Sequence, residues 1–224
     1  MVRSPKDLVP YFFGKTARTY ERIATFATFG RDNYWKKEIV SKIENANSIL
    51  DLACGTGKLT RMIAGIFPRS RIVGLDISKS YLEIACKNSF QNILYVHQDA
   101  ERMSLDEKFD CICSSYIPKY CNPQILIKNC INHLTNEGSI IFHDFVFPKN
   151  KLVKIFWKLH FMFLRFLGNF IPPWSYAFSE LPKLVEASKW VEEYSKELIK
   201  NGFVVRQQNL TWNSSAILYA KKNI

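Results

Sequence analysis

The sequence predicts an α/β protein with a doubly wound, Rossmann-like sheet that is mostly parallel. Three observations indicate this fold: short apolar runs alternate with segments of helical periodicity from residue 48 to residue 145, a glycine-rich turn follows the first run, and an aspartate lies at or near the end of each of the first two. In such sheets, ligands bind beyond the carboxyl ends of the strands. We therefore expect the functional site at those strand ends.

The expected strands and helices follow one another in regular alternation. Strands are expected to end at Leu52 and Asp76 and then to cover 93–98, 110–114 and 139–145, with helices to about Phe67 and over about 79–88 and 123–133. Two apolar runs near the C-terminus, 203–208 and 215–221, predict a hairpin. This hairpin would add one antiparallel strand to the sheet.

A chain of 224 residues, 47% of them hydrophobic, is long enough for one sizeable core, so we expect a single domain. Its expected parts are a helical N-terminal cap (1–45), a cofactor-binding core (46–146), a helical insertion (147–190), and a C-terminal helix and hairpin that complete the sheet (191–224). The insertion is too long for an ordinary connection. We expect it to close over the ligand site as a lid.

The glycine-rich turn lies in the stretch 49–60, which reads Ile-Leu-Asp-Leu-Ala-Cys-Gly-Thr-Gly-Lys-Leu-Thr. Gly55 and Gly57 permit a sharp turn in which a ligand approaches bare backbone at a helix N-terminus. A dinucleotide turn would have a third glycine where this chain has Thr60. The turn therefore does not favour a nicotinamide dinucleotide.

Two carboxylates indicate which cofactor fits. Asp51 stands four residues before Gly55, where it would repel a pyrophosphate but suits an ammonium or sulfonium charge. Asp76 ends the next strand, at the distance where an acidic residue accepts hydrogen bonds from ribose hydroxyls, and we place Ile77 in the same site. Together with the two glycines, these carboxylates predict S-adenosyl-L-methionine.

Two later strand ends supply further candidate contacts. Asp99 and Ala100 follow the third strand, where a carboxylate and a neighbouring backbone N–H would bind the adenine. Ser115 follows the fourth strand, where the methyl end of the cofactor would meet the substrate. The alternatives are a helix cap for Asp99 and a turn residue for Ser115.

The net charge of +11 raises nucleic acid or an anionic membrane as partners. Four basic residues form one stripe on a predicted helix over 151–167 that is otherwise apolar, and they are Lys151, Lys154, Lys158 and Arg165. No transmembrane span or secretory signal is apparent, which predicts a cytoplasmic chain. The helix is expected either to dock peripherally on the inner face of the membrane or to act only as a lid.

The chain lacks the sequence features of metal-binding and nucleic-acid-modifying proteins. The six cysteines show no spacing of zinc type, so we expect reduced thiols and no metal site. The chain has no Asn-Pro-Pro-Tyr-like run after the fourth strand to hold a flipped adenine, and no appended RNA-binding module. Nucleic acid is therefore not the expected partner.

Several motifs are similar to those of a known family: Ala17-x-x-Tyr20-Glu21, Phe29-Gly30-x-Asp32-x-x-Trp35, the run from Leu50 to Gly57, Phe109-Asp110-Cys111-Ile112, Gly202-Phe203, Asn209-Leu210-Thr211 and Ala216-Ile217-Leu218. Through them, the chain resembles the ubiquinone/menaquinone biosynthesis C-methyltransferases, within the class I S-adenosylmethionine-dependent methyltransferases. The resemblance covers nearly the full length. It implies methylation of a ring carbon of a polyprenylated, demethylmenaquinol-like quinol.

The resemblance also implies cofactor contacts at Thr56, Asp76, the pair Asp99–Ala100, and Ser115. The chain departs from the family after Ser115, where Tyr-Ile-Pro-Lys-Tyr replaces a Phe-Gly-Leu-Arg-Asn-like run. A lysine in place of the arginine keeps the charge but loses the planar fork of the guanidinium.

Methylation of a ring carbon requires that a ring hydroxyl be deprotonated or strongly hydrogen-bonded. The candidates for this task are Lys119, His143 and Tyr20, and each has a purely structural alternative. Other hypotheses are a methyltransferase acting on another small molecule, RNA or protein, and a non-catalytic cofactor-binding protein at the membrane surface.

Overall fold

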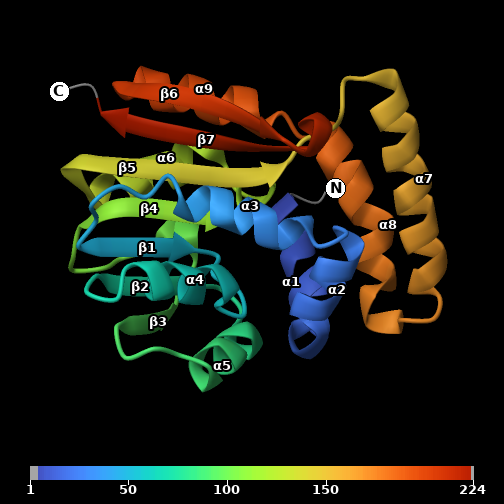
Figure 1. Cartoon of the computed structure of the whole chain (residues 1–224), viewed down its shortest axis with the longest axis horizontal. Helices are drawn as coiled ribbons and strands as arrows, with labels where there is room; N and C mark the ends of the chain where they lie inside the picture. The colour runs from blue at the N-terminus through green and yellow to red at the C-terminus, as the bar shows by residue number, and fades with distance from the viewer. Residues whose placement is uncertain (1–4, 223–224) are drawn as a thin grey trace.

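Seven strands form one sheet in the computed structural model, which describes residues 5–222. Their order across the sheet is β3-β2-β1-β4-β5-β7-β6 (Figure 1). The strands are β1 (Ser48–Leu52), β2 (Arg71–Asp76), β3 (Ile93–His97), β4 (Phe109–Ser115), β5 (Leu134–Phe145), β6 (Phe203–Leu210) and β7 (Ser215–Lys222). Only β7 pairs antiparallel with its neighbours β5 and β6, so the predicted fold class is confirmed.

Helices cover both faces of this sheet. The α-helices are α1 (Val9–Phe13), α2 (Tyr20–Ala27), α3 (Arg31–Val40), α4 (Lys58–Ile66), α5 (Lys79–Lys87), α6 (Pro123–Asn132), α7 (Lys151–Gly168), α8 (Pro172–Ala187) and α9 (Trp190–Lys200). Short 3₁₀ turns lie at Pro5–Leu8, Ala17–Thr19, Ala100–Arg102, Pro118–Tyr120 and Thr211–Asn213. The apolar side chains of α3 and α4 pack in one core cluster, and those of α6 and α9 pack in another.

The alternation of side chains along β1 explains these two clusters. Leu50 and Leu52 are fully buried with α6 and α9, whereas Ile49 is buried with α3 and α4. Because both faces are covered, β1 and β2 read as nearly continuous apolar runs. Asp51 interrupts the apolar run of β1. It lies on the same face of the sheet as Ile49, so its side chain points toward α4.

A third group of helices lies beyond the carboxyl ends of the strands. Figure 1 shows α1 and α2, from the start of the chain, beside α7 and α8. These helices share an aromatic cluster that includes Phe12, Phe161, Trp174 and Phe178. Segments far apart in sequence therefore form one cover over the strand ends.

Several element boundaries differ from the expectation by one or more residues. β5 begins at Leu134 instead of residue 139, because the buried Leu134 pairs with Phe109 before the register shifts. β6 continues to Leu210, so the hairpin connection is shorter than expected. α7 ends at Gly168, and Pro172 begins α8, where a proline lacks only an N–H that the first helical turn leaves unpaired.

The turn between β1 and α4 is held tightly against β3. Gly57 has a φ of +79°, and a Cβ at this position would lie 2.4 Å from the Tyr95 hydroxyl and 3.1 Å from the Ala85 Cβ. The Tyr95 hydroxyl is itself buried without a hydrogen-bond partner in the described part of the chain. Glycine is therefore required at residue 57 both for backbone conformation and for space.

We predict that Gly57→Ala lowers the free energy of unfolding by at least about 2 kcal/mol, because it combines left-handed backbone strain with a clash. The matched control is Gly65→Ala in α4, where nothing lies within 4 Å of the new Cβ. That control should be neutral or stabilising by up to about 1 kcal/mol. Urea denaturation measures both variants. Equal effects at the two positions would contradict the packing described, and adding Tyr95→Phe to Gly57→Ala should recover part of the loss.

Candidate functional site

A cavity of about 350 Å³ lies at the carboxyl ends of β1, β2 and β3, where doubly wound sheets bind ligands. Its lining includes six of the nine residues predicted to contact the cofactor: Gly55, Asp76, Ile77, Asp99, Ala100 and Ser115. These residues come from four separate loops, so the fold brings together side chains that the sequence places up to 60 positions apart. We call this space the polar-ended cavity, since two carboxylates lie in its wall.

Asp76 is fixed by the turn that follows β1. Its Oδ2 accepts a hydrogen bond from the Gly55 N–H at 2.8 Å, and its Oδ1 accepts one from the Ser78 N–H at 2.7 Å. Burial raises the pKa of this carboxyl, while the backbone donors counteract that effect. An ionised carboxylate has about four acceptor positions, so lone pairs remain for the hydroxyl groups of a ligand.

Three predicted cofactor contacts do not line this cavity. Asp51 is 1% exposed and lies behind the turn, where it accepts a hydrogen bond from the Thr60 hydroxyl at 2.7 Å. Thr56 is buried and donates to Glu21 Oε1 at 2.8 Å, and Gly57 is the N-cap residue that precedes α4. Strand alternation turns the Asp51 side chain toward α4 and away from the cavity lining, so its contact with a cationic ligand stays a prediction.

The start of the chain closes the polar-ended cavity. The Lys6 ammonium donates to both carboxylate oxygens of Asp99, at 2.6 and 2.8 Å, and also to Glu101. Asp99 Oδ1 additionally accepts the Glu101 N–H at 3.0 Å, so this residue caps a helical turn as well as lining the cavity. Sequence reasoning missed Lys6, since a lone lysine near a chain end carries no signal of such a long-range pair.

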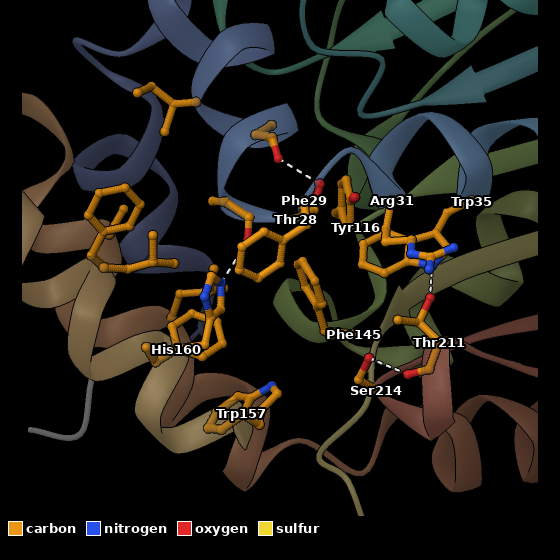
Figure 2. A pocket seen from close by; sticks show the side chains of 18 of the residues that line it. Thr28, Phe29, Arg31, Trp35, Tyr116, Phe145, Trp157, His160, Thr211 and Ser214 are labelled. Carbon is orange, nitrogen blue, oxygen red and sulfur yellow. Dashed lines mark hydrogen bonds between the residues drawn. The ribbon is translucent and has the colours of Figure 1, made fainter. Parts of the chain in front are cut away.

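A second cavity, of about 430 Å³, adjoins the first and is mostly apolar. It lies between the ends of β4 and β5 and the helices α2, α7 and α8. Figure 2 shows Trp157 and His160 of α7 facing the same space as Tyr116 and Phe145. We call it the aromatic cavity.

Four side chains line both cavities: Phe13, Tyr20, Tyr116 and Tyr120. They form the boundary across which a group would pass from one ligand to the other. The Tyr116 ring stacks on Phe145 with 5.1 Å between ring centroids, and its backbone has a φ of +77°. A bulky residue rarely adopts this conformation, so surrounding contacts must hold Tyr116 in place.

Asp32 is the contact that orients Tyr116. It accepts a hydrogen bond from the Tyr116 hydroxyl at 2.9 Å and forms ion pairs with Lys36 and, at 2.8 Å, with Lys58. Burial alone would raise the pKa of Asp32, but the two ammonium groups lower it to about 2. The carboxylate is thus ionised at neutral pH, and it links α3, the N-terminus of α4 and the end of β4.

Lys119 is the one predicted catalytic cation in the wall of the aromatic cavity. Its Nζ donates to Asp144 Oδ1 at 2.7 Å and to the Tyr116 carbonyl at 2.9 Å. Burial lowers the pKa of Lys119, and the adjacent Asp144 carboxylate opposes that effect. An ammonium has three N–H donors, so one is left for a ligand in the cavity.

The other two candidates are placed differently. Tyr20 lines both cavities, and burial raises its pKa well above the usual value, so it remains a phenol. His143 lines neither cavity, and its ring nitrogens lie 3.1 Å from the Ser115 hydroxyl and 2.6 Å from the Ser215 hydroxyl. Burial lowers the pKa of His143 well below its usual value. In this arrangement His143 positions Ser115, and its role as a base stays a prediction.

The N-terminal motifs noted in the sequence hold the cap on the core. Glu21 Oε1 accepts hydrogen bonds from Thr56 and from Arg61, both at 2.8 Å. Trp35 Nε1 donates to the Thr211 hydroxyl at 2.8 Å, which joins the N-terminal and C-terminal motifs (Figure 2). The sequence alone does not predict these contacts, because only the fold brings the motifs together.

Comparison with known proteins bears on this site. A family model described as a methyltransferase domain matches residues 49–138. The demethylmenaquinone methyltransferase of Thermus thermophilus is 28% identical over 92% of this chain and 97% of its own length. The malonyl-[acyl-carrier protein] O-methyltransferase of Bacillus anthracis is 32% identical, but this chain spans only 39% of its length. The plantazolicin methyltransferase BpumL, solved with SAH, has a TM-score of 0.66 at 14% identity, covering 98% of this chain and 95% of its own.

The chain is an S-adenosylmethionine-dependent methyltransferase with a class I fold. The family resemblance seen in the motifs is confirmed by relatives that extend over most of the chain. The polar-ended cavity of this methyltransferase fits the cofactor, since it offers the Asp76 carboxylate to hydroxyl groups and the bare backbone of Gly55 to a close approach.

We predict that Asp51 gives the methyltransferase a distinctive pH dependence of stability. Burial raises the pKa of Asp51 to about 7, against about 3.9 for an unfolded aspartate. The folded state therefore holds an extra proton between these values, and the free energy of unfolding falls as pH rises through this window, by up to about 1.4 kcal/mol per pH unit. Urea denaturation at several pH values measures this slope.

Asp51→Asn should flatten that slope, because the amide oxygen still accepts the Thr60 hydroxyl and no longer titrates. Asp106→Asn is the control, since Asp106 is solvent-exposed in the loop before β4 and should leave the slope unchanged. Identical slopes in the wild type and the Asp51→Asn variant would show that Asp51 is ionised in the folded chain.

Proposed function

We propose that the chain transfers the methyl group of S-adenosylmethionine to a ring carbon of a quinol-like aromatic that carries a long apolar tail. The observation that supports this most directly is the pair of adjoining cavities. One has a carboxylate suited to a ribose, the other is large and apolar, and only four aromatic side chains separate them. A polar donor and an apolar acceptor would meet at that boundary.

The lining of the aromatic cavity supports a planar, apolar acceptor. Rings from α1, α2, α8 and the end of β4 offer stacking and edge contacts, while charged groups are few. Nucleic acid would require cations along an open groove, and this cavity is instead covered by α7 and α8. Three relatives called demethylmenaquinone methyltransferases each match 90% or more of this chain, which supports a quinol substrate.

The similarity to malonyl-[acyl-carrier protein] O-methyltransferases covers less than half of this chain. It supports the cofactor and does not extend to the full set of elements that build the aromatic cavity.

When bound, S-adenosylmethionine supplies an electrophilic methyl group. The protein's own contribution is positioning in a dry site: Phe13, Tyr20, Tyr116 and Tyr120 would orient the ring and exclude water. The remaining N–H of Lys119 would donate to a ring oxygen and stabilise its negative charge, which makes the neighbouring carbon nucleophilic. The ring carbon gains a methyl group and releases one proton.

The test measures transfer of an isotopically labelled methyl group to a prenylated naphthoquinol that lacks the ring methyl. We predict turnover by the wild type and a fall in kcat of about 100-fold in Lys119→Met/Asp144→Asn, with cofactor affinity unchanged. Both residues are changed so that no buried charge is left unpaired. Lys183→Met/Glu180→Gln is the control, because it removes a more exposed ion pair on α8 that lines neither cavity and should therefore retain the turnover.

Different results would contradict the quinol substrate and the role of Lys119. Cofactor binding by the wild type without labelled product would contradict the quinol substrate. Product formation at the wild-type rate in the double variant would contradict the role of Lys119, and Tyr20 would be the next residue to test.

A further inference from the structure

The outer face of α7 is apolar and exposed. Its residues are Leu152, Ile155, Phe156, Leu159, Met162, Phe163 and Phe166, each 49–69% exposed, and Phe170 follows at 71%. We call this set the α7 face. The opposite side of the same helix packs in the aromatic cluster through Phe161 and Leu164. An exposed apolar patch of this extent marks an interaction site.

A row of cations borders the α7 face along one edge. At 100° per residue, Lys151, Lys158 and Arg165 lie next to the exposed apolar residues, and all three are exposed. Lys154 belongs to the same row but has its Nζ 5.0 Å from the centroid of the Phe147 ring. No acidic residue occurs from residue 145 to residue 179. The chemistry of this surface is therefore complementary to a layer with anionic headgroups above an apolar interior.

The mouth of the aromatic cavity opens beside this face. Phe29, Phe156 and Trp212 line the cavity and are nevertheless 77%, 69% and 77% exposed. Phe29 and Trp212 have φ values of +50° and +53°. Large side chains rarely adopt this left-handed conformation, so the fold holds these two rings outward at the mouth.

We propose that the α7 face, together with Phe29 and Trp212, docks on an anionic lipid bilayer and opens the aromatic cavity toward the acyl chains. Within residues 5–222 no helix is long and apolar enough to cross a membrane, so α7 would lie in the interface. Aromatic side chains sit at the acyl boundary and lysine stems reach the headgroups. A second copy of the chain would instead bring two basic rows together with no acid on this segment.

Docking on the bilayer does not depend on the proposed function. Delivery of a lipid-tailed substrate from the bilayer does rest on the proposed function. A tailed quinol partitions into the acyl region, and a cavity mouth at that depth would take up its ring without exposing the tail to water. The experiment therefore measures membrane binding and methyl transfer separately.

Binding is measured by flotation of the full chain with phosphatidylcholine vesicles, with and without phosphatidylglycerol. We expect flotation only with the anionic vesicles, and release at high salt. Lys158→Glu/Arg165→Glu should weaken binding at least about tenfold, since each basic residue near such a surface contributes a factor of about five. The charge-matched control is Lys87→Glu/Lys128→Glu, on α5 and α6, where both lysines are exposed.

The apolar contribution is tested with Ile155→Ser/Leu159→Ser, neither of which lines the aromatic cavity. Its control is Ile66→Ser/Ile199→Ser, at exposed positions on α4 and α9. Loss of flotation in the first pair and not in the second supports docking. Equal flotation with neutral vesicles, or equal effects of variants and controls, overturns it. A dimer in vesicle-free solution that Ile155→Ser/Leu159→Ser converts to a monomer also overturns it, because the face would then bind a second copy.

Measurements of methyl transfer test the delivery from the bilayer separately from the proposed function. With a water-soluble quinol that lacks the tail, the docking variants should turn over at the wild-type rate, whereas with a tailed quinol in vesicles they should be slower. If the wild type methylates neither quinol, the proposed function fails while flotation still decides the docking. If docking variants and controls methylate the tailed quinol at equal rates, delivery from the bilayer is wrong.

Discussion

The buried carboxylate of Asp32 is the interaction on which the site depends. It is 1% exposed and is bound at once by Lys36, Lys58 and the Tyr116 hydroxyl. A buried charge that loses its partners costs about 3–5 kcal/mol, so these three groups constrain one another. As a result, the cap helix α3, the N-terminus of α4 and the end of β4 are held in one arrangement, and Tyr116 stands at the boundary of both cavities.

Other long-range contacts extend this constraint around the two cavities. Glu21 ties α2 to the turn after β1, Lys6 ties the start of the chain to Asp99, and Trp35 ties α3 to Thr211. The N-terminal helices therefore line both the polar-ended cavity and the aromatic cavity. Such a cover excludes water from the place where a methyl group would be transferred, which strengthens every electrostatic contact there.

The strand-end residues could be predicted because topology alone determines where parallel strands end. Asp76 and Ser115 were placed by counting along the chain, and both line the polar-ended cavity. The alternation of side chains along β1 also predicts that Asp51 faces α4, since Asp51 points to the opposite face of the sheet from Leu50 and Leu52. Reading that alternation would have separated Asp51 from the cavity.

The contacts of His143 and Lys6 could not be predicted, because their partners lie far away in sequence. The same holds for the contacts of Asp32 with Lys58 and Tyr116. His143 meets Ser215, 72 residues later, and Lys6 meets Asp99, 93 residues later. The pattern of α7 was ambiguous for another reason. Its apolar residues surround most of the helix, so periodicity alone does not show which side packs on the protein and which stays exposed.

The most direct test of the account is a crystal structure with S-adenosylhomocysteine and a demethylated naphthoquinol bound together. The account predicts the ribose hydroxyls at the Asp76 carboxylate, the quinol ring in the aromatic cavity, and the ring carbon facing the cofactor sulfur between Tyr20 and Tyr116. A cofactor bound away from Asp76, or a quinol bound outside the aromatic cavity, would contradict it.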